Sequence, residues 1–224
     1  MRYNVKMHVI PSIDVEKIED LTAQLRRLTP FYNRFQIDYA DGQYVNFLTP
    51  PLIDLLNSLS PYRELRFDLH LMTLDYRKAL ESIRKHENKS KLNTIFIHHG
   101  ANPPPELFLD SSAPYNYGLV LNPADSVDAI KHIYDLQNIK NIQIMSVVPG
   151  PQGNPFLLDS LNKVDRLRDL DYRNFIFLDG GVNKESLEIS KKNKHLPDYI
   201  CPGSFFSQAP NMENQIHYLT EALK

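Results

Sequence analysis

The sequence predicts an α/β fold, a single (β/α)8 (TIM) barrel, from two observations. First, strand-like stretches alternate with amphipathic, helix-like stretches in eight consecutive units along the 224 residues. Such alternation implies parallel strands joined by right-handed crossovers, and eight of these units close into a barrel. Second, the loop after the first predicted strand reads Pro11-Ser12-Ile13-Asp14. A doubly wound open sheet usually carries a glycine-rich loop at this place, so the barrel is favoured.

The first units are predicted from alternation and from helical spacing. Residues 3–10 alternate apolar and polar side chains and stop at Pro11, so they predict a strand. Residues 14–28 carry apolar side chains at helical spacing, with acidic residues early and Arg26 and Arg27 late, as a helix dipole prefers. Residues 35–40 alternate again and break at a turn signal. Two prolines, at 50 and 51, begin a short helix, because proline is tolerated in a first helical turn.

The same pattern continues to the end of the chain. The proline-rich segment 102–105 makes the fourth helix short or irregular. No linker or low-complexity tract interrupts the alternation, so residues 1–224 are expected to form one barrel domain. Further strands are predicted at 64–72, 91–98, 117–121, 142–148, 175–178 and 199–201, and further helices at 74–86, 125–136, 157–167, 183–190 and 211–223.

Composition narrows the class of protein and the kinds of partner. The chain is 42% hydrophobic and 23% charged, and 25 basic against 27 acidic residues leave a net charge of −2. This balance gives no basic surface for nucleic acid or for an anionic membrane. The single cysteine, Cys201, excludes an intramolecular disulfide framework, and the sequence has neither a signal peptide nor a run of transmembrane length. We therefore expect a cytoplasmic protein with no nucleic-acid or membrane partner.

Polar residues at the C-terminal ends of the strands are the candidates for chemistry, because a barrel of this kind builds its active site there. Asp38, His70 and Asp179 end three strands that can face each other across the barrel mouth. Carboxylate and imidazole groups suit a divalent metal ion. Two carboxylates on opposite sides of a bound carbonyl compound could also remove and return a proton at one carbon. Each group could instead be merely hydrogen-bonded at a strand end, and for His98 and His99 we prefer that structural interpretation.

The last three strands end in loops that contain glycine. Glycine lets backbone N–H groups approach an anion closely, and barrel enzymes often bind phosphate in this quarter. A single glycine pair is more often a plain turn, but three adjacent ones favour a phosphate site. The residues concerned are Gly150, Gly153, Gly180, Gly181, Gly203 and Ser204.

Seven motifs, in order along nearly the whole chain, resemble the ribulose-phosphate 3-epimerase family. The second-strand segment Asp38-Tyr39-Ala40-Asp41-Gly42 is similar to the family's Asp-x-Met-Asp-Gly, and Leu178-Asp179-Gly180-Gly181 resembles its Val-Asp-Gly-Gly. The other five are Pro11-Ser12-Ile13, His70-Leu71-Met72, Gly118 to Pro123, Met145 to Gly150, and Gly203-Ser204. No single motif is decisive, but seven on the expected strands are highly specific.

The resemblance implies an epimerase that inverts C3 of a ketose phosphate of the ribulose 5-phosphate/xylulose 5-phosphate type, with one divalent metal ion (Zn, Fe, Mn or Co). Asp38 and Asp179 would transfer protons on opposite faces of the substrate and, with His70, would bind the metal. The metal would stabilise an enediolate. Ser12 would hydrogen-bond to the substrate, Met72 and Met145 would line the site, and the six residues of the glycine-containing loops would hold the phosphate. Family members are often homo-oligomers, and the sequence leaves the oligomeric state of this chain open.

The chain departs from the family at its site. The family's fourth metal ligand is a histidine, and this chain has Gln36 there, a neutral and weaker ligand that would lower metal affinity or favour harder ions. Ala40 replaces a methionine, and Pro151 removes one backbone donor from the loop after the sixth strand. An alternative is therefore a catalytically weak or inactive relative that binds a sugar phosphate or serves an assembly role. The related decarboxylase/synthase barrels need an Asp-x-Lys-x-x-Asp strand, and Asp68-Leu69-His70 has no lysine.

Overall fold

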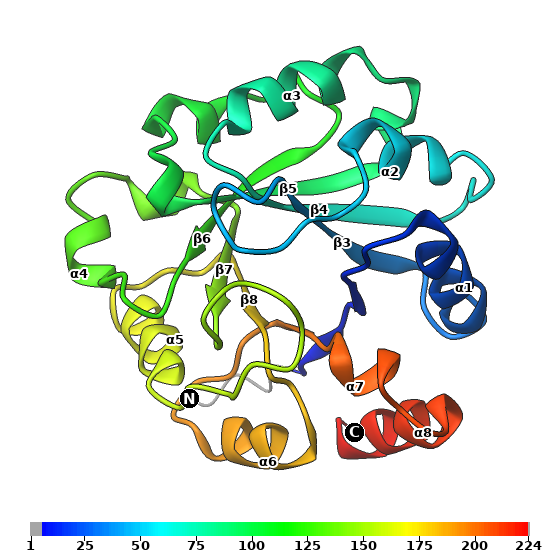
Figure 1. Cartoon of the computed structure of the whole chain (residues 1–224). Helices are drawn as coiled ribbons and strands as arrows, with labels where there is room; N and C mark the ends of the chain where they lie inside the picture. Colours follow the sequence, from blue (N-terminus) through cyan, green and yellow to red (C-terminus); the bar gives the residue numbers. More distant parts are fainter. Residues whose placement is uncertain (1–5, 224) are drawn as a thin grey trace.

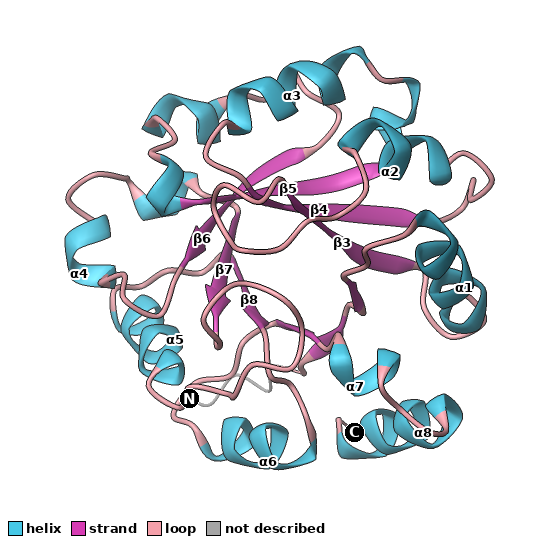
Figure 2. Cartoon of the chain, viewed as in Figure 1, coloured by secondary structure: helices cyan, strands magenta, loops and turns pink. Residues whose placement is uncertain are grey.

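Parallel strands form the centre of the fold, and helices surround them (Figures 1 and 2). The computed structural model describes residues 6–223. Each strand is parallel to its neighbours, and the sheet runs in the order β1-β9-β8-β7-β6-β5-β4-β3-β2. The segments are β1 (His8–Val9), β2 (Ser12–Ile13), β3 (Arg34–Ala40), β4 (Arg66–Met72), β5 (Leu92–His98), β6 (Asn116–Leu121), β7 (Asn141–Met145), β8 (Phe175–Asp179) and β9 (Tyr199–Cys201).

The first strand is interrupted, and it closes the barrel. Its first piece, β1, pairs with β9, and its second piece, β2, pairs with β3. Between them, the N–H of Ile10 donates to Ile200 O (3.0 Å), and Pro11 O accepts from the N–H of Gln36 (2.9 Å). Pro11 has no N–H to donate, which explains the break. The nine segments therefore occupy eight positions around a barrel, as predicted. The prediction that this strand stops at Pro11 is wrong, and its residues 3–5 lie outside the described part of the chain.

The helices of the described residues follow the predicted order. Expected boundaries shift most in the fifth unit, where only one helical turn, α4, forms within 125–136. After it the chain continues in turns, and Tyr134 is held by a hydrogen bond from its OH to Pro103 O (2.9 Å). The helices are α1 (Ile18–Leu28), α2 (Leu52–Ser58), α3 (Tyr76–Lys85), α4 (Val127–Ile130), α5 (Ser160–Asp169), α6 (Lys184–Lys192), α7 (Ser204–Ser207) and α8 (Met212–Ala222), with 3-10 turns η1 (Glu87–Lys91), η2 (His99–Ala101), η3 (Pro105–Leu109) and η4 (Leu136–Asn138).

Of three further elements, one agrees with the prediction and two differ from it. The fourth helix is reduced to the 3-10 turn η3 after its prolines, as expected. The strand predicted at 142–148 ends at Met145, because Pro149 and Gly150 turn the chain, and Val148 is 62% exposed. The short helix α7 was not predicted. None of the helices among residues 6–223 combines the length and apolarity needed to cross a bilayer.

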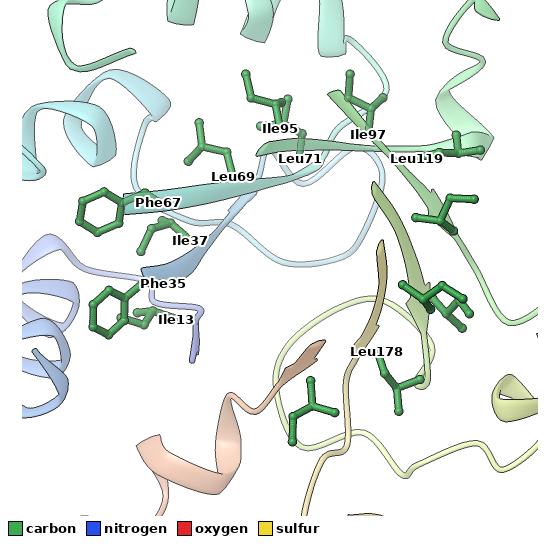
Figure 3. Close-up of a cluster of buried hydrophobic side chains, with 14 of the residues drawn as sticks. Ile13, Phe35, Ile37, Phe67, Leu69, Leu71, Ile95, Ile97, Leu119 and Leu178 are labelled. Atoms are coloured by element: carbon green, nitrogen blue, oxygen red, sulfur yellow. The ribbon is translucent and has the colours of Figure 1, made fainter. Parts of the chain in front are cut away.

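The main hydrophobic core lies between the barrel and its helices. Alternate strand residues point outward into it, including Phe35 and Ile37 of β3 and Leu69 and Leu71 of β4, which are fully buried (Figure 3). The remaining strand residues point into the barrel. A smaller apolar cluster there contains Phe96, Phe177 and five other residues. Because side chains alternate along a strand, the parity that buries Phe35 and Ile37 outside sends Gln36 and Asp38 inside. This places the polar strand ends at the barrel mouth.

Candidate active site

Three residues with metal-ligating side chains meet at the C-terminal ends of their strands. Asp38 of β3 is paired in register with His70 of β4, and Asp179 ends β8 on the other side of the mouth. His70 Nδ1 lies 3.3 Å from Asp38 Oδ1 and 3.5 Å from Asp179 Oδ2. One ligand atom from each residue lies within 4.8 Å of the others, and all three side chains are buried. These three ligand atoms are close enough together to hold one cation.

Two glutamine amides lie between and beside these carboxylates. Gln36 Nε2 donates to Asp179 Oδ2 (2.7 Å) and Asp38 Oδ1 (3.1 Å), and it lies 3.4 Å from Ser12 Oγ. Gln143 Nε2 donates to the same Asp179 oxygen (2.8 Å). Ser12 Oγ donates to Asp38 Oδ2 (3.2 Å). These donors offset the repulsion between two carboxylates that share a buried site.

Both amides leave a carbonyl oxygen unused. Within residues 6–223, neither Gln36 Oε1 nor Gln143 Oε1 has a hydrogen-bond partner, although both side chains are fully buried. Such groups are rare in native structures, and they call for an explanation such as an ion. Gln143 was missed at the sequence level. The available signal was a polar side chain between two isoleucines, two residues before Met145 and therefore on the same face of the strand.

Burial and like charge alter the proton affinities at the site. Burial, together with the charge of Asp38, raises the pKa of Asp179 to about 7, against the opposing effects of His70 and the Gln36 hydrogen bond. Burial alone would lower the pKa of His70, but its hydrogen bond to Asp38 and the charges of Asp38 and Asp179 raise it. Asp14, just beyond β2, has its pKa raised to about 8 by burial and by Asp38. Asp14 was not among the predicted site residues, although it directly follows the end of β2.

The glycine-containing loops form the rest of the same pocket. Gly150, Gly153, Gly180 and Gly181 all have positive φ, between 62° and 147°. At Gly180 a side chain is also excluded by contact, because an added Cβ would lie 2.4 Å from Val147 Cγ2. One pocket brings together every site residue predicted from the sequence except Gln36. The predicted residues that line it are Ser12, Asp38, His70, Met72, Met145, Gly150, Gly153, Asp179, Gly180, Gly181, Gly203 and Ser204.

His98 is a buried, hydrogen-bonded histidine, and its partner lies in the site. His98 Nε2 is 2.8 Å from His70 Nε2, and His98 Nδ1 is 2.9 Å from Asn122 Oδ1. Burial and the neighbouring His70 lower the pKa of His98 well below its usual value. His99 is turned elsewhere, with its Nδ1 3.4 Å from Tyr134 OH. The sequence could place His98 at a strand end but could not show which group it contacts.

A family model and individual relatives of known sequence point to the same family. The model of the family described as "Ribulose-phosphate 3 epimerase family" matches residues 8–198. The ribulose-phosphate 3-epimerase of Bacillus subtilis is 30% identical over 158 residues, which cover 67% of this chain and 69% of that protein. The ribulose-phosphate 3-epimerase of Synechocystis sp. is 29% identical over 188 residues, covering 80% and 78%.

Solved structures of low sequence identity share the fold. A crystal structure of KGPDC from Streptococcus mutans matches with a TM-score of 0.70 at 11% identity, over 97% of each chain. The 3-hexulose-6-phosphate synthase from Salmonella typhimurium matches with a TM-score of 0.66 at 9% identity, over 97% of this chain and 98% of that one. At such identities, the likeness shows the barrel fold alone.

Proposed function

This chain belongs to the ribulose-phosphate 3 epimerase family, and from that premise we propose that it inverts C3 of a ketose phosphate, interconverting ribulose 5-phosphate and xylulose 5-phosphate. The chain is an enzyme of the isomerase class, an epimerase. The observation that carries the proposal is one pocket that is lined by two carboxylates, an imidazole and four positive-φ glycines. Such a pocket can hold the reacting carbon beside the carboxylates and a phosphate against the glycine loops.

Asp38 and Asp179 are proposed as the two proton-transfer groups. One carboxylate takes the proton from C3, which leaves an enediolate, and the other carboxylic acid delivers a proton to the opposite face of the same carbon. The exchange conserves atoms and charge, and the two residues swap roles in the reverse direction. The pKa of Asp179, raised to about 7, supports this assignment, because such a group is present in both protonation states at neutral pH. Ser12, which donates to Asp38, would fix that carboxylate and contact the substrate.

The residues present also fit a divalent metal ion. Asp38, His70 and Asp179 would hold it, and Gln36 would add its Oε1 after its amide rotates, since that buried oxygen has no hydrogen bond to lose among the described residues. When bound, the ion supplies Lewis-acid stabilisation of the negative charge that develops on the substrate oxygens. A set of three oxygens and one nitrogen suits Mn²⁺ or Fe²⁺ at least as well as Zn²⁺ or Co²⁺.

Phosphate recognition is proposed to rest on backbone groups. No lysine or arginine lines the part of this pocket that the structure describes. The N–H groups of Gly153, Gly181 and Gly203, with the Ser204 hydroxyl, would donate to the phosphate oxygens. Met72 and Met145 would cover the apolar side of the sugar carbons.

Deuterium exchange tests the proposal directly. The purified protein is analysed for metal and then incubated with ribulose 5-phosphate in deuterated water. We expect near-stoichiometric divalent metal and deuterium at C3. The Asp179→Asn variant should lose exchange by several orders of magnitude while keeping its circular dichroism spectrum, and unchanged exchange in that variant would sink the two-aspartate mechanism.

One observation favours the alternative of a weak or inactive relative. The amide of Gln36 bridges the two carboxylates, and as long as its nitrogen stays there it competes with any cation for the same oxygens. A chain that keeps this arrangement would bind a sugar phosphate without turnover. Binding of ribulose 5-phosphate without C3 exchange, after supply of Zn²⁺, Mn²⁺, Fe²⁺ or Co²⁺, would identify this alternative.

A further inference from the structure

Four polar side chains form a continuous hydrogen-bonded row that begins at His70 and leads away from the two carboxylates. His70 Nε2 lies 2.8 Å from His98 Nε2 at the end of β5. His98 Nδ1 lies 2.9 Å from Asn122 Oδ1, just after β6, and Asn122 Nδ2 donates to Tyr44 OH (2.5 Å) in the loop after β3. The Tyr44 ring covers His98, with a centroid distance of 4.5 Å. The row thus runs from the buried site to the half-buried loop.

The row has a direction because each imidazole carries one proton when neutral. His70 Nδ1 is the nitrogen that faces Asp38 and Asp179, so it must be unprotonated to coordinate a cation, and the proton then sits on Nε2. That Nε2–H can only donate to His98 Nε2. His98 must therefore carry its own proton on Nδ1, which donates to Asn122 Oδ1.

The last two links select this direction. Asn122 turns its carbonyl oxygen to His98 and its NH2 group to Tyr44 OH. The backbone N–H of Asn122 donates to Asp125 Oδ2 (2.7 Å), which holds the residue in place beyond the end of β6. The reverse direction would need the Asn122 NH2 group against His98 Nδ1. It would then put a proton on His70 Nδ1, facing Asp38, and would close that nitrogen to a metal ion.

We propose that His98 and Asn122 are positioning residues that hold His70 in the tautomer with its Nδ1 lone pair directed at the cation site, and that Tyr44 anchors the row. The inference rests on the proposed function in that it takes His70 as a metal ligand. Groups that hydrogen-bond to the far nitrogen of a ligating histidine fix its tautomer and orientation, and their loss typically costs 10- to 100-fold in metal affinity.

The test measures Zn²⁺ affinity and the tautomer of His70 in the full chain. Isothermal titration of Zn²⁺ into the metal-free protein should show a loss of roughly 10- to 100-fold for Asn122→Leu, which keeps the size of the side chain and removes the acceptor. Asn122→Asp keeps the acceptor and should stay within a few-fold of the native chain. His98→Leu should lose at least as much as Asn122→Leu. The matched control is His99→Leu, the adjacent histidine whose ring nitrogen faces Tyr134, and its affinity should not change.

Long-range ¹H–¹⁵N spectra separate this proposal from the proposed function. We expect the His70 proton on Nε2 in the Zn²⁺-loaded native chain, and more of the Nδ1–H form in Asn122→Leu. A proton on Nδ1 of native His70, or native Zn²⁺ affinity in Asn122→Leu, would overturn the inference. Failure of deuterium exchange alone would overturn the proposed function instead. If His98→Leu does not fold, Asn122→Leu and Asn122→Asp still decide the matter, because Asn122 is only half-buried.

Discussion

Gln36 is the residue whose side chain contacts both carboxylates of the candidate site. Its amide nitrogen donates hydrogen bonds to both carboxylates, and these bonds offset part of the repulsion between the carboxylates in the metal-free chain. An imidazole at this position would be a stronger ligand for a transition metal than a carboxamide oxygen. We therefore expect Gln36→His to raise Zn²⁺ affinity by roughly tenfold or more. Competition against a chelator measures this, and unchanged affinity would mean that position 36 does not coordinate.

Removing the amide should cost stability before any metal is added. In Gln36→Leu, Asp38 and Asp179 lose a shared donor and keep their mutual repulsion. We expect the free energy of unfolding of the metal-free protein to fall by about 1–3 kcal/mol at pH 8, the cost of unsatisfied buried partners. Denaturant titration measures it. The loss should shrink near pH 6, where a proton on Asp179 relieves the repulsion, and a pH-independent loss would contradict this explanation.

The raised pKa of Asp179 gives metal binding a definite pH dependence. The pKa of Asp179 is about 7, so its carboxyl group is protonated in the metal-free protein at lower pH, and a cation must displace that proton. Apparent affinity should therefore rise by about tenfold per pH unit as the pH rises towards 7, and flatten above it. The raised pKa of His70 acts in the same direction. Calorimetry in two buffers of different ionisation enthalpy counts the protons released on metal binding. If no more protons are released at pH 6 than at pH 8, the expected pH dependence is wrong.

At the scale of elements, β3 and β4 are also joined by an ion pair between Arg34, whose side chain is 20% exposed, and the fully buried Asp68. Arg34 Nε donates to Asp68 Oδ2 (2.9 Å) and Arg34 Nη2 to Asp68 Oδ1 (3.0 Å), and the guanidinium lies over the rings of Phe177 (5.4 Å) and Tyr199 (5.1 Å). Burial raises the pKa of Asp68 even with Arg34 beside it. The pair therefore lies inside the barrel just below the candidate site, because Arg34 and Asp68 come two residues before Gln36 and His70 on the same strands.

Breaking one partner of this pair should cost more than removing both. Arg34→Met leaves a fully buried carboxylate unpaired, and we expect a loss of about 3–5 kcal/mol in the free energy of unfolding. The double variant Arg34→Met with Asp68→Leu should recover most of that loss, because two apolar side chains can fill the space. Urea titration of the single and double variants measures both. A double variant as unstable as Arg34→Met would contradict this account.

Strands and helices were predictable from the sequence where one local pattern, such as strand alternation, determined them. Strand alternation placed Asp38 inside and Phe35 outside without any tertiary information, and Asp179 followed from the strand end. The fifth helix was predicted too long, because the apolar spacing of 125–136 continues where tertiary contacts turn the chain, and Ile133 is 52% exposed. Gln143 was missed although its position two residues before Met145 puts both side chains on one face of the strand. The contact of His98 with His70 was missed because it depends on the register between strands, which no single stretch of sequence specifies.

At the scale of the whole molecule, the candidate site joins strands that are distant in the chain. Asp38, His70 and Asp179 come from β3, β4 and β8, and the glycine loops follow β7, β8 and β9. The barrel was predictable because eight strand–helix units alternate along the chain, and the family was predictable because seven of its motifs occur in order. Cytoplasmic location stays a prediction.

Because the proposed cation ligands come from β3, β4 and β8, metal binding should stabilise the entire fold and not one loop. A ligand that binds only the folded state adds about 2.7 kcal/mol at a concentration 100 times its Kd. We expect Zn²⁺ or Mn²⁺ to raise the Tm of the native chain in a concentration-dependent way, and a chelator to reverse it. In the Asp179→Asn variant, the Tm of the metal-free protein should stay within a few degrees of the native value or rise, because a buried charge is removed. The variant should nevertheless lose the metal-dependent increase in Tm. An equal increase in that variant would place the stabilising cation elsewhere on the molecule.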